Sequence, residues 1–309
     1  MTINPTDVHD PVVQIFAGKE IDMDNFDPRV GPNATQRAFM VAHDLYAATK
    51  FFFFIVNLVL TALFGMKTTK DRVHAGVRLL GKLSAYFSIV EAQGRGSLHV
   101  HMLLWLQDAP NMETMHSLLD MPEFRKYVEQ YINFNIQADI PRLDAAMVKE
   151  TPQETQIVYS RPPDPGDSNW KAHFEDRLRH VVQSQQMHVC SWATCKQYDS
   201  HGHPVCKCRA PWELLEDTKV FANGEYIIHH RIPFMNNFNP SLSVTLNCNN
   251  DIKPLTNGSD TKHIMWYLTL YQSKKQDKSH NLSALLAEAY MYHDSKSDTD
   301  RVSGVVDQN

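Results

Sequence analysis

The chain has 309 residues, of which 43% are hydrophobic and 21% are charged. This composition is typical of a folded protein and excludes a disordered chain, and the length suits one large domain or two of ordinary size. The net charge of −5, with His neutral, excludes a bulk basic surface for nucleic acid, so any such surface must be local.

The N-terminal region is expected to begin with turns and to continue as helices. Prolines break the first 34 residues, and the start lacks the basic and apolar segments of a secretion signal. A helix is expected to begin near residues 33–35, and a longer one is expected from about Asp44, which can cap it, to Phe64. Its apolar part, Phe51 to Phe64, is shorter than the roughly 20 residues of a membrane span. We therefore expect a core helix rather than a membrane anchor.

A hairpin is the clearest prediction for the next stretch. The basic segment from Lys67 to Lys82 is expected to be helical and to lead into a strand from about Ser84 to Gln93. Two glycines flank Arg95 and predict a tight turn. After the turn, apolar residues occupy every second position from Leu98 to Leu106, which predicts a strand with one buried face.

The opposite face of that second strand carries His99 and His101. A hairpin centred on Arg95 places Glu91 directly opposite His99, with Cβ atoms roughly 5 Å apart, and diagonal to His101. Two imidazoles and one carboxylate suit a divalent cation. The alternative interpretation is a half-exposed strand whose polar side chains face water.

The middle of the chain predicts helices followed by a cysteine-rich segment. Two short helices separated at Pro122 are expected within residues 111–135, a loop within 150–170, and a helix from Trp170 to about Gln186. Four of the five cysteines then lie close together, which favours reduced thiols and a metal such as zinc, although a loop of free thiols is the alternative. The candidate segment contains His188, Cys190, Cys195, His201, His203, Cys206 and Cys208.

The remaining elements are a hairpin, a strand and two helices. Asn223-Gly224 predicts the turn of a hairpin from Lys219 to Arg231, and Ser241 to Asn247 alternates like a strand. A helix is expected over residues 261–275 and another near 282–293, before a polar tail. Tyr267 and Tyr271 lie one turn apart on the first of these helices, where the pattern alone favours a core role.

Residues 91–105 resemble the core motif of the Helitron-like replication-initiator domain, a fungal-type member of the HUH endonucleases of rolling-circle transposons. The resemblance extends over roughly residues 4–295. It implies an α+β fold with a central antiparallel sheet of the HUH type, flanking helices and a zinc-binding insertion. The other similar segments, in the same order, are residues 4–9, the Phe-rich helix, 208–213, 237–240, 248–253 and Tyr267-x3-Tyr271.

The resemblance divides the chain into consecutive regions. The expected regions are an N-terminal helical region (1–65), the first part of the nuclease core with the His-x-His strand (66–150), the loop, helix and zinc insertion (151–215), the remaining core with the tyrosine helix (216–295), and a disordered tail (296–309).

The resemblance also implies an enzyme that nicks and rejoins single-stranded DNA through a 5′-phosphotyrosine intermediate. It assigns His99 and His101 as ligands of Mg²⁺ or Mn²⁺, and Tyr267 and Tyr271 as nucleophiles. The hairpin geometry makes Glu91 the candidate third ligand. Gln93, on the same face, is the alternative.

Further expectations concern zinc and partners. The resemblance places His188, Cys195 and Cys208 above Cys190 and Cys206 as zinc ligands. It implies that the partners are single-stranded transposon ends and a helicase domain on a longer or separate chain. A monomer located in the nucleus, without a membrane, is expected. The candidate DNA contacts are Arg95, Lys274 and Lys275.

Two departures from the family pattern leave a rival interpretation open. Asn250 stands where family members often carry His, and no P-loop is present to drive unwinding. The rival is a catalytically inert DNA-binding module, derived from such an enzyme and stabilised by zinc. A zinc hydrolase is disfavoured because no H-E-x-x-H helix is found.

Overall fold

The computed structural model describes residues 1–26, 32–68, 73–92, 97–140, 143, 162–192, 195–208 and 210–273. Several sequence predictions lie outside these residues, namely Gln93, Arg95, Lys274, Lys275 and the helix expected near 282–293. The backbone of Tyr267 and Tyr271 is described, but their side chains are not.

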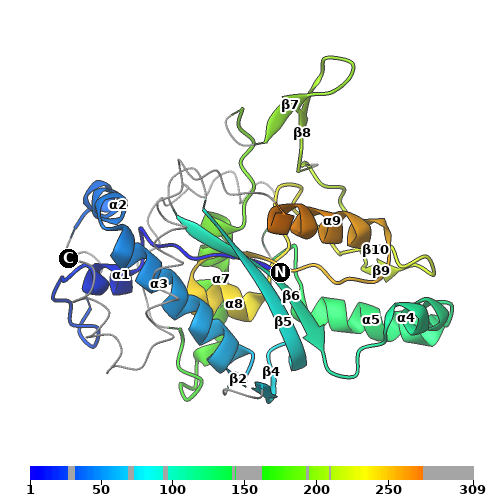
Figure 1. The fold of residues 1–309 in the computed structure, drawn as a ribbon, viewed down its shortest axis with the longest axis horizontal. Helices are drawn as coiled ribbons and strands as arrows, with labels where there is room; N and C mark the ends of the chain where they lie inside the picture. The colour runs from blue at the N-terminus through cyan, green and yellow to red at the C-terminus, as the bar shows by residue number, and fades with distance from the viewer. Residues whose placement is uncertain are drawn as a thin grey trace.

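The fold is α+β around a five-stranded antiparallel sheet (Figure 1). This confirms the predicted fold class and the antiparallel sheet. The strand order is β11 (Asn249–Asp251), β1 (Thr2–Asn4), β6 (Leu98–Leu106), β5 (Gly81–Ala92) and β4 (Val77–Arg78). The N-terminal strand β1 therefore lies between β6 on one side and β11, which comes almost 250 residues later, on the other.

The two long strands form the predicted hairpin. Glu91 pairs with His99 and Ile89 pairs with His101, as a turn centred on Arg95 requires. The face that carries Val100 and Met102 is buried. The glycine turn therefore predicted the register of the hairpin, and the alternation of apolar residues predicted the buried side of β6.

Three helices follow β1: α1 (Pro11–Phe16), α2 (Ala34–His43) and α3 (Leu45–Leu58), which continues as one π-helical stretch (Val59–Leu63). Side chains cap all three, since Asp10, Asn33 and Asp44 accept hydrogen bonds from backbone N–H groups of the first turns. The caps confirm the predicted starts of α2 and α3.

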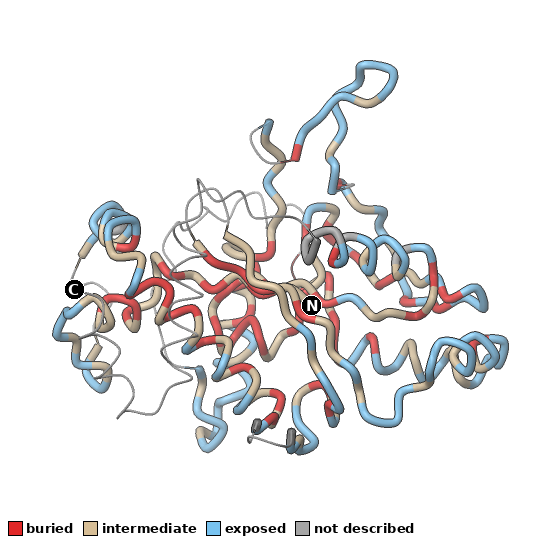
Figure 2. Tube along the Cα trace, viewed as in Figure 1, coloured by how far each residue is buried: buried red, intermediate tan, exposed pale blue. Residues whose placement is uncertain are grey.

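The apolar helix packs one side into the core. Phe51 and Val59 are among its fully buried residues, and α3 lies against α1 and β6 (Figure 2). The 19 residues Leu45–Leu63 are also long and apolar enough to cross a membrane, judged by length and composition alone, and 33% of their apolar window is buried. The side that carries Phe51 and Val59 packs in the core, as expected, and the rest of the window is not buried.

The helix predicted over residues 67–82 is wrong. The described residues of this stretch form β2 (Met66–Thr68), β3 (Val73–Ala75) and β4. Gly65 precedes β2, Gly76 separates β3 from β4, and Gly81 begins β5; Gly65 and Gly81 adopt φ of +66° and +99°. The β-branched Val73 and Val77 favour the extended backbone between them.

Three further helices follow β6; the first two pack on the main core, and the third borders a second, smaller core. The predicted helices are confirmed as α4 (Met112–Leu119), α5 (Pro122–Asn135) and α7 (Trp170–Gln185). Pro122 stands at the first turn of α5, where its missing N–H costs nothing. The second core contains Ile140, Leu143, Leu178, Val182, Ile232, Met235, Phe238 and Val244.

The strand predicted over Ser241–Asn247 is also wrong, because this segment forms α8 (Pro240–Leu246). Asn239 caps the helix by accepting from the N–H of Leu242, Pro240 occupies the first turn, and Asn247 ends the helix at φ 48°. These local signals outweighed the alternating pattern.

Two small hairpins and a last helix complete the described fold. The predicted Asn223-Gly224 turn joins β9 (Lys219–Val220) to β10 (Tyr226–Ile227), and α9 (Ser259–Ser273) is the predicted tyrosine helix. The hairpin of β7 (Lys196–Tyr198) and β8 (Pro204–Cys206) projects from the body, and nearly all of its chain is exposed (Figures 1 and 2).

Candidate metal centre

Three side chains of the β5–β6 hairpin direct ligand atoms to one point. Nε2 of His99 lies 2.9 Å from Oε2 of Glu91, and Nε2 of His101 lies 3.3 Å from the same oxygen. The two imidazole nitrogens are 3.1 Å apart. This convergence is what the hairpin geometry predicted, whereas the alternative of separate polar groups facing water does not account for it. Gln93, the other candidate third ligand, lies outside the described residues.

The three ligand atoms are close enough together to share one cation. Their separations are 2.9, 3.1 and 3.3 Å. A mixed nitrogen and oxygen donor set of this kind suits Mn²⁺, and Mg²⁺ less well.

Burial keeps the two imidazoles in the form that binds metal. Burial lowers the pKa of His99, against the opposing effect of Glu91. Burial and then the neighbouring His99 lower the pKa of His101. Both rings are therefore neutral near pH 7, with a lone pair available to a cation.

One further contact orients His101. Its Nδ1 lies 2.8 Å from the hydroxyl oxygen of Thr2 on β1. If Nε2 binds a cation, Nδ1 carries the proton and donates it to Thr2, which fixes the ring. Nδ1 of His99 is buried and has no such partner among the described residues. Sequence reasoning missed Thr2, because no local pattern links two residues 99 positions apart.

The same cross-strand row continues beyond Thr2. Thr2 pairs with His101 on one side and with Asp251 of β11 on the other, so the three residues occupy one face of the sheet. Burial raises the pKa of Asp251, and Lys253 lies 3.9 Å from its carboxylate. Two segments that the resemblance singled out without a role thus lie in this part of the sheet: residues 4–9 begin at the end of β1, which pairs with β6, and residues 248–253 contain β11, which pairs with β1.

Asn250 has a structural role. It is fully buried, its Oδ1 accepts a hydrogen bond from the N–H of Asn239, and its Nδ2 donates to Ser243. The neighbouring residues on β11 point to the other face of the sheet. The side chain at this position therefore supports α8 rather than the metal centre.

The helix that carries the two tyrosines lies close to the hairpin. α9 packs against β5, and Tyr267 and Tyr271 lie one turn apart on it. Its start is fixed by a contact between two turns, in which the Thr256 hydroxyl donates to the carbonyl of Gly224 and a Cβ on Gly224 would come within 2.0 Å of the carbonyl oxygen of Thr256. The reach of the tyrosine hydroxyls toward His99 and His101 stays a prediction.

A second cluster lies at the root of the β7–β8 hairpin. Nε2 of His188 lies 3.4 Å from the sulfur of Cys195 and 3.3 Å from that of Cys206, and Cys190 completes a group of four donors within 4.8 Å of one another. A zinc ion bound at about 2.0 Å to nitrogen and 2.3 Å to sulfur separates such atoms by about 3.5 Å. The cluster could therefore bind a metal such as zinc.

The cluster changes the ranking of the expected zinc ligands. Cys190 and Cys206 belong to it, whereas Cys208, ranked above them from the resemblance, does not. The hairpin register explains the difference, since Cys206 pairs with Lys196 and so lies beside Cys195. Burial opposes ionisation of Cys206, but the N–H groups of Ala210 and Cys208, with Cys190 and His188, lower its pKa to about 6.

The comparison with protein families agrees with the resemblance. Residues 1–104 match the model described as the Helitron helicase-like domain at the N-terminus. The chain carries a Helitron-related domain. No curated protein and no solved structure matches the chain. All three converging donors, Glu91, His99 and His101, lie within the Helitron-related domain, whereas the cysteine cluster and α9 follow it in the chain.

Proposed function

We propose that this protein nicks and rejoins single-stranded DNA through a covalent tyrosine intermediate, as the transposase of a rolling-circle transposon. The observation that carries the proposal is the convergence of Glu91, His99 and His101 inside a Helitron-related domain. Transposon ends would be the substrate, a helicase domain on a longer or separate chain the partner, and the nucleus the place of action. The sheet with its flanking helices would then be of the HUH type.

The residues of the metal centre would hold Mn²⁺ or Mg²⁺. Glu91, His99 and His101 supply three donors, and Thr2 holds the ring of His101 in place. Such a cation supplies charge that offsets the negative charge of a scissile phosphate. The buried, apolar reverse face of β6 fixes the strand that carries both imidazoles.

The tyrosines would supply the nucleophile. The phenolic oxygen of Tyr267 or Tyr271 bonds to phosphorus, and the bond between phosphorus and the 3′ oxygen breaks. The phenol loses one proton and the released 3′-hydroxyl gains one, so the exchange of one ester for another conserves bond energy and can be reversed. Because a free tyrosine has a pKa of about 10, it is a weak nucleophile at neutral pH without this environment. Two tyrosines on one helix allow two strands to be cut and joined in turn.

The deciding experiment is adduct formation. The full chain is incubated with labelled single-stranded oligonucleotides and Mn²⁺, and the products are separated on a denaturing protein gel. A labelled protein band that is stronger with Mn²⁺ than with Mg²⁺, and is lost in His99→Ala and in the Tyr267→Phe/Tyr271→Phe double variant, supports the proposal. His74→Ala, an exposed histidine outside the cluster, is the matched control and should keep the band.

The rival function predicts a different outcome. A catalytically inert DNA-binding remnant, stabilised by zinc, would bind the oligonucleotides but form no adduct with any sequence tried. Folded wild-type protein that binds DNA and remains unlabelled would therefore replace the nicking proposal with the rival.

A further inference from the structure

The β7–β8 hairpin and its root form a projection with its own surface chemistry. We call residues 192 and 195–207 the arm. In Figure 1 the arm extends from the body on the side of α9, and Figure 2 shows that its chain is almost entirely exposed. Its strands are only three residues each, so the arm has little core of its own. It is therefore built to present side chains outward.

The arm presents a pair of aromatic rings to solvent. Trp192 and Tyr198 are 55% and 67% exposed, and their ring centroids lie 4.9 Å apart with 38° between the planes. The ammonium of Lys196 lies 5.9 Å from the centroid of the Trp192 ring. Large aromatic side chains that are exposed to water beside a cation indicate a binding surface, because a ligand that buries them gains free energy.

The arm is held at its root by the cysteine cluster. Cys195 immediately precedes β7 and Cys206 ends β8, and both sulfurs contact His188. The N–H of Lys207 also donates to the carbonyl of Cys195. His188 in turn is fixed to the body, because its N–H donates to the carbonyl of Phe234. The ring pair is thus positioned relative to the body before any ligand arrives.

The charge of the segment is opposite to that of the whole chain. Between His188 and Cys208 the chain carries Lys196, Lys207 and a single acidic residue, Asp199, in a protein with a net charge of −5. The Asp199 carboxylate is engaged at the hairpin tip, where it accepts from the N–H groups of His201 and His203. Lys196 therefore places a positive charge beside the Trp192 ring.

We infer that the Trp192–Tyr198 pair, with Lys196 beside it, is a stacking platform for the bases of single-stranded DNA. The inference rests on the proposed function and assigns part of its substrate to a definite surface. Two rings and one cation suit unpaired bases and their phosphates, because base stacking on aromatic rings tolerates any sequence.

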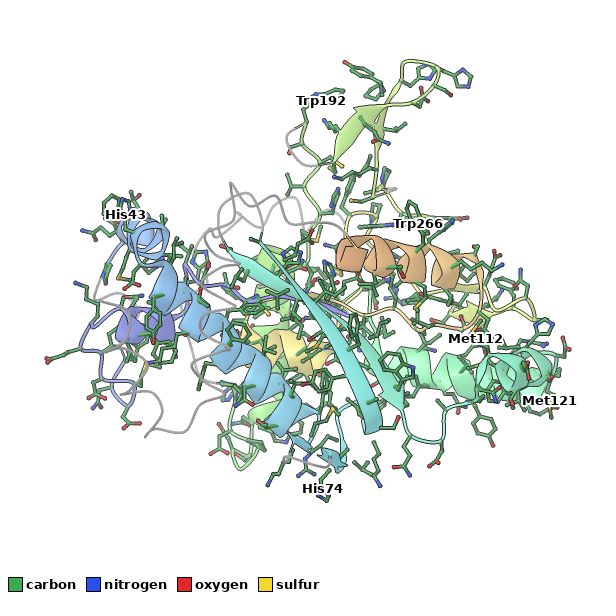
Figure 3. All side chains as sticks on the ribbon, viewed as in Figure 1. His43, His74, Met112, Met121, Trp192 and Trp266 are labelled. Carbon is green, nitrogen blue, oxygen red and sulfur yellow. The ribbon has the colours of Figure 1, made fainter. Side chains whose placement is uncertain are left out.

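A third exposed ring lies on the tyrosine helix itself. Trp266, which is 67% exposed, directly precedes Tyr267 on α9. Figure 3 shows Trp192 at the root of the arm and Trp266 on the edge of α9 that is nearer the arm in this view. Trp266 would offer a bound DNA strand a further ring next to the candidate nucleophiles.

The test measures DNA binding apart from chemistry. The full chain, loaded with zinc and without Mn²⁺, is titrated against a fluorescently labelled oligo-dT, and Kd is read from anisotropy. Trp192→Ala and Tyr198→Ala should each raise Kd by roughly 5- to 100-fold, while Trp192→Phe should stay within about threefold of wild type. Val205→Ala is the matched control, because Val205 is an exposed arm residue opposite Gln197, whose side chain points away from the Tyr198 face.

Each outcome separates this inference from the nicking proposal. Alanine variants that keep their zinc and bind oligo-dT like wild type overturn the platform, whatever the adduct assay shows. DNA binding that depends on the arm, without any adduct, would support the platform and contradict the proposed nicking activity. Self-association that is lost in Trp192→Ala, with unchanged DNA affinity, would assign the rings to a second copy of the chain and overturn the inference.

Discussion

The hydroxyl of Thr2 lies 2.8 Å from Nδ1 of His101, across 99 residues of sequence. The contact makes β1 part of the metal centre, although β1 supplies no ligand. Removing the hydroxyl by Thr2→Val should weaken Mn²⁺ binding by roughly 10- to 100-fold, because the ring of His101 loses the group that orients it. The affinity can be measured by the loss of the free Mn²⁺ signal in electron paramagnetic resonance.

Thr2→Ser is the control for that experiment. It keeps the hydroxyl, so it should bind Mn²⁺ within a few-fold of wild type. Equal affinity for the Val and Ser variants, with both folded, would show that the contact does not orient His101.

The cysteine cluster should hold one zinc ion per chain. Cys195→Ser and Cys206→Ser should each lose that zinc, because both sulfurs lie against His188 at the centre of the cluster. Cys208→Ser should keep it, as should Cys248→Ala, since Cys248 is buried elsewhere in the core. Zinc content by mass spectrometry of the native protein decides the matter. Loss of zinc from Cys208→Ser alone would restore the ligand ranking drawn from the resemblance.

Gly224 should be among the positions least tolerant of substitution. It adopts φ of +80°, and an added Cβ would lie 2.0 Å from the carbonyl oxygen of Thr256 and 2.9 Å from the nitrogen of Gly258. Gly224→Ala must therefore displace the turn that precedes α9, at a cost of about 1–3 kcal/mol in the free energy of unfolding beyond the backbone strain. Urea denaturation measures this cost.

Gly202 provides the matched control for Gly224. It has nearly the same φ, +79°, but an added Cβ would meet nothing within 4 Å. Gly202→Ala therefore isolates the backbone strain. If the two variants lose the same stability, the contact between the Gly224 turn and the start of α9 contributes nothing.

Asp10 should make the protein less stable as the pH rises through mild acidity. Burial raises the pKa of this carboxyl to about 6, although the N–H of Val12 opposes the shift. Because the folded-state pKa lies above the unfolded value of about 4, the folded state binds the extra proton, and stability falls from about pH 4 to pH 6 and is level above. Asp10→Asn keeps the helix cap and removes this ionisation. It should raise Tm at pH 7 and leave it unchanged at pH 4, whereas an equal rise at both would contradict the assignment.

Local patterns predicted the parts of the site that depend on neighbouring residues. The glycine turn was enough to place Glu91 opposite His99, and the alternation after it identified the face of β6 that is buried. The position of Tyr267 and Tyr271 on one helix followed from the same kind of reasoning at the helical period. These predictions did not depend on residues that are far away in the sequence.

Contacts between distant residues could not be predicted in this way. Thr2 approaches His101 only because β1 pairs with β6, and the pairing of short strands carries no signal in sequence. Cys206 joins Cys195 through the register of β7 and β8, which the spacing of the cysteines does not reveal. The wrong prediction of a strand at α8 had a different cause. Asn239 and Pro240 are typical of a helix start, but the alternating residues after them favoured a strand.

The placement of β1 between β6 and β11 bears on how the protein folds. β1 is three residues long, and its outer edge is covered by a strand that begins at Asn249. A fragment that ended at residue 104 would contain every donor of the metal centre, yet it would leave β1 with an unpaired edge and the second core unbuilt. The sheet that carries the candidate metal centre is therefore closed only when chain synthesised much later pairs with β1.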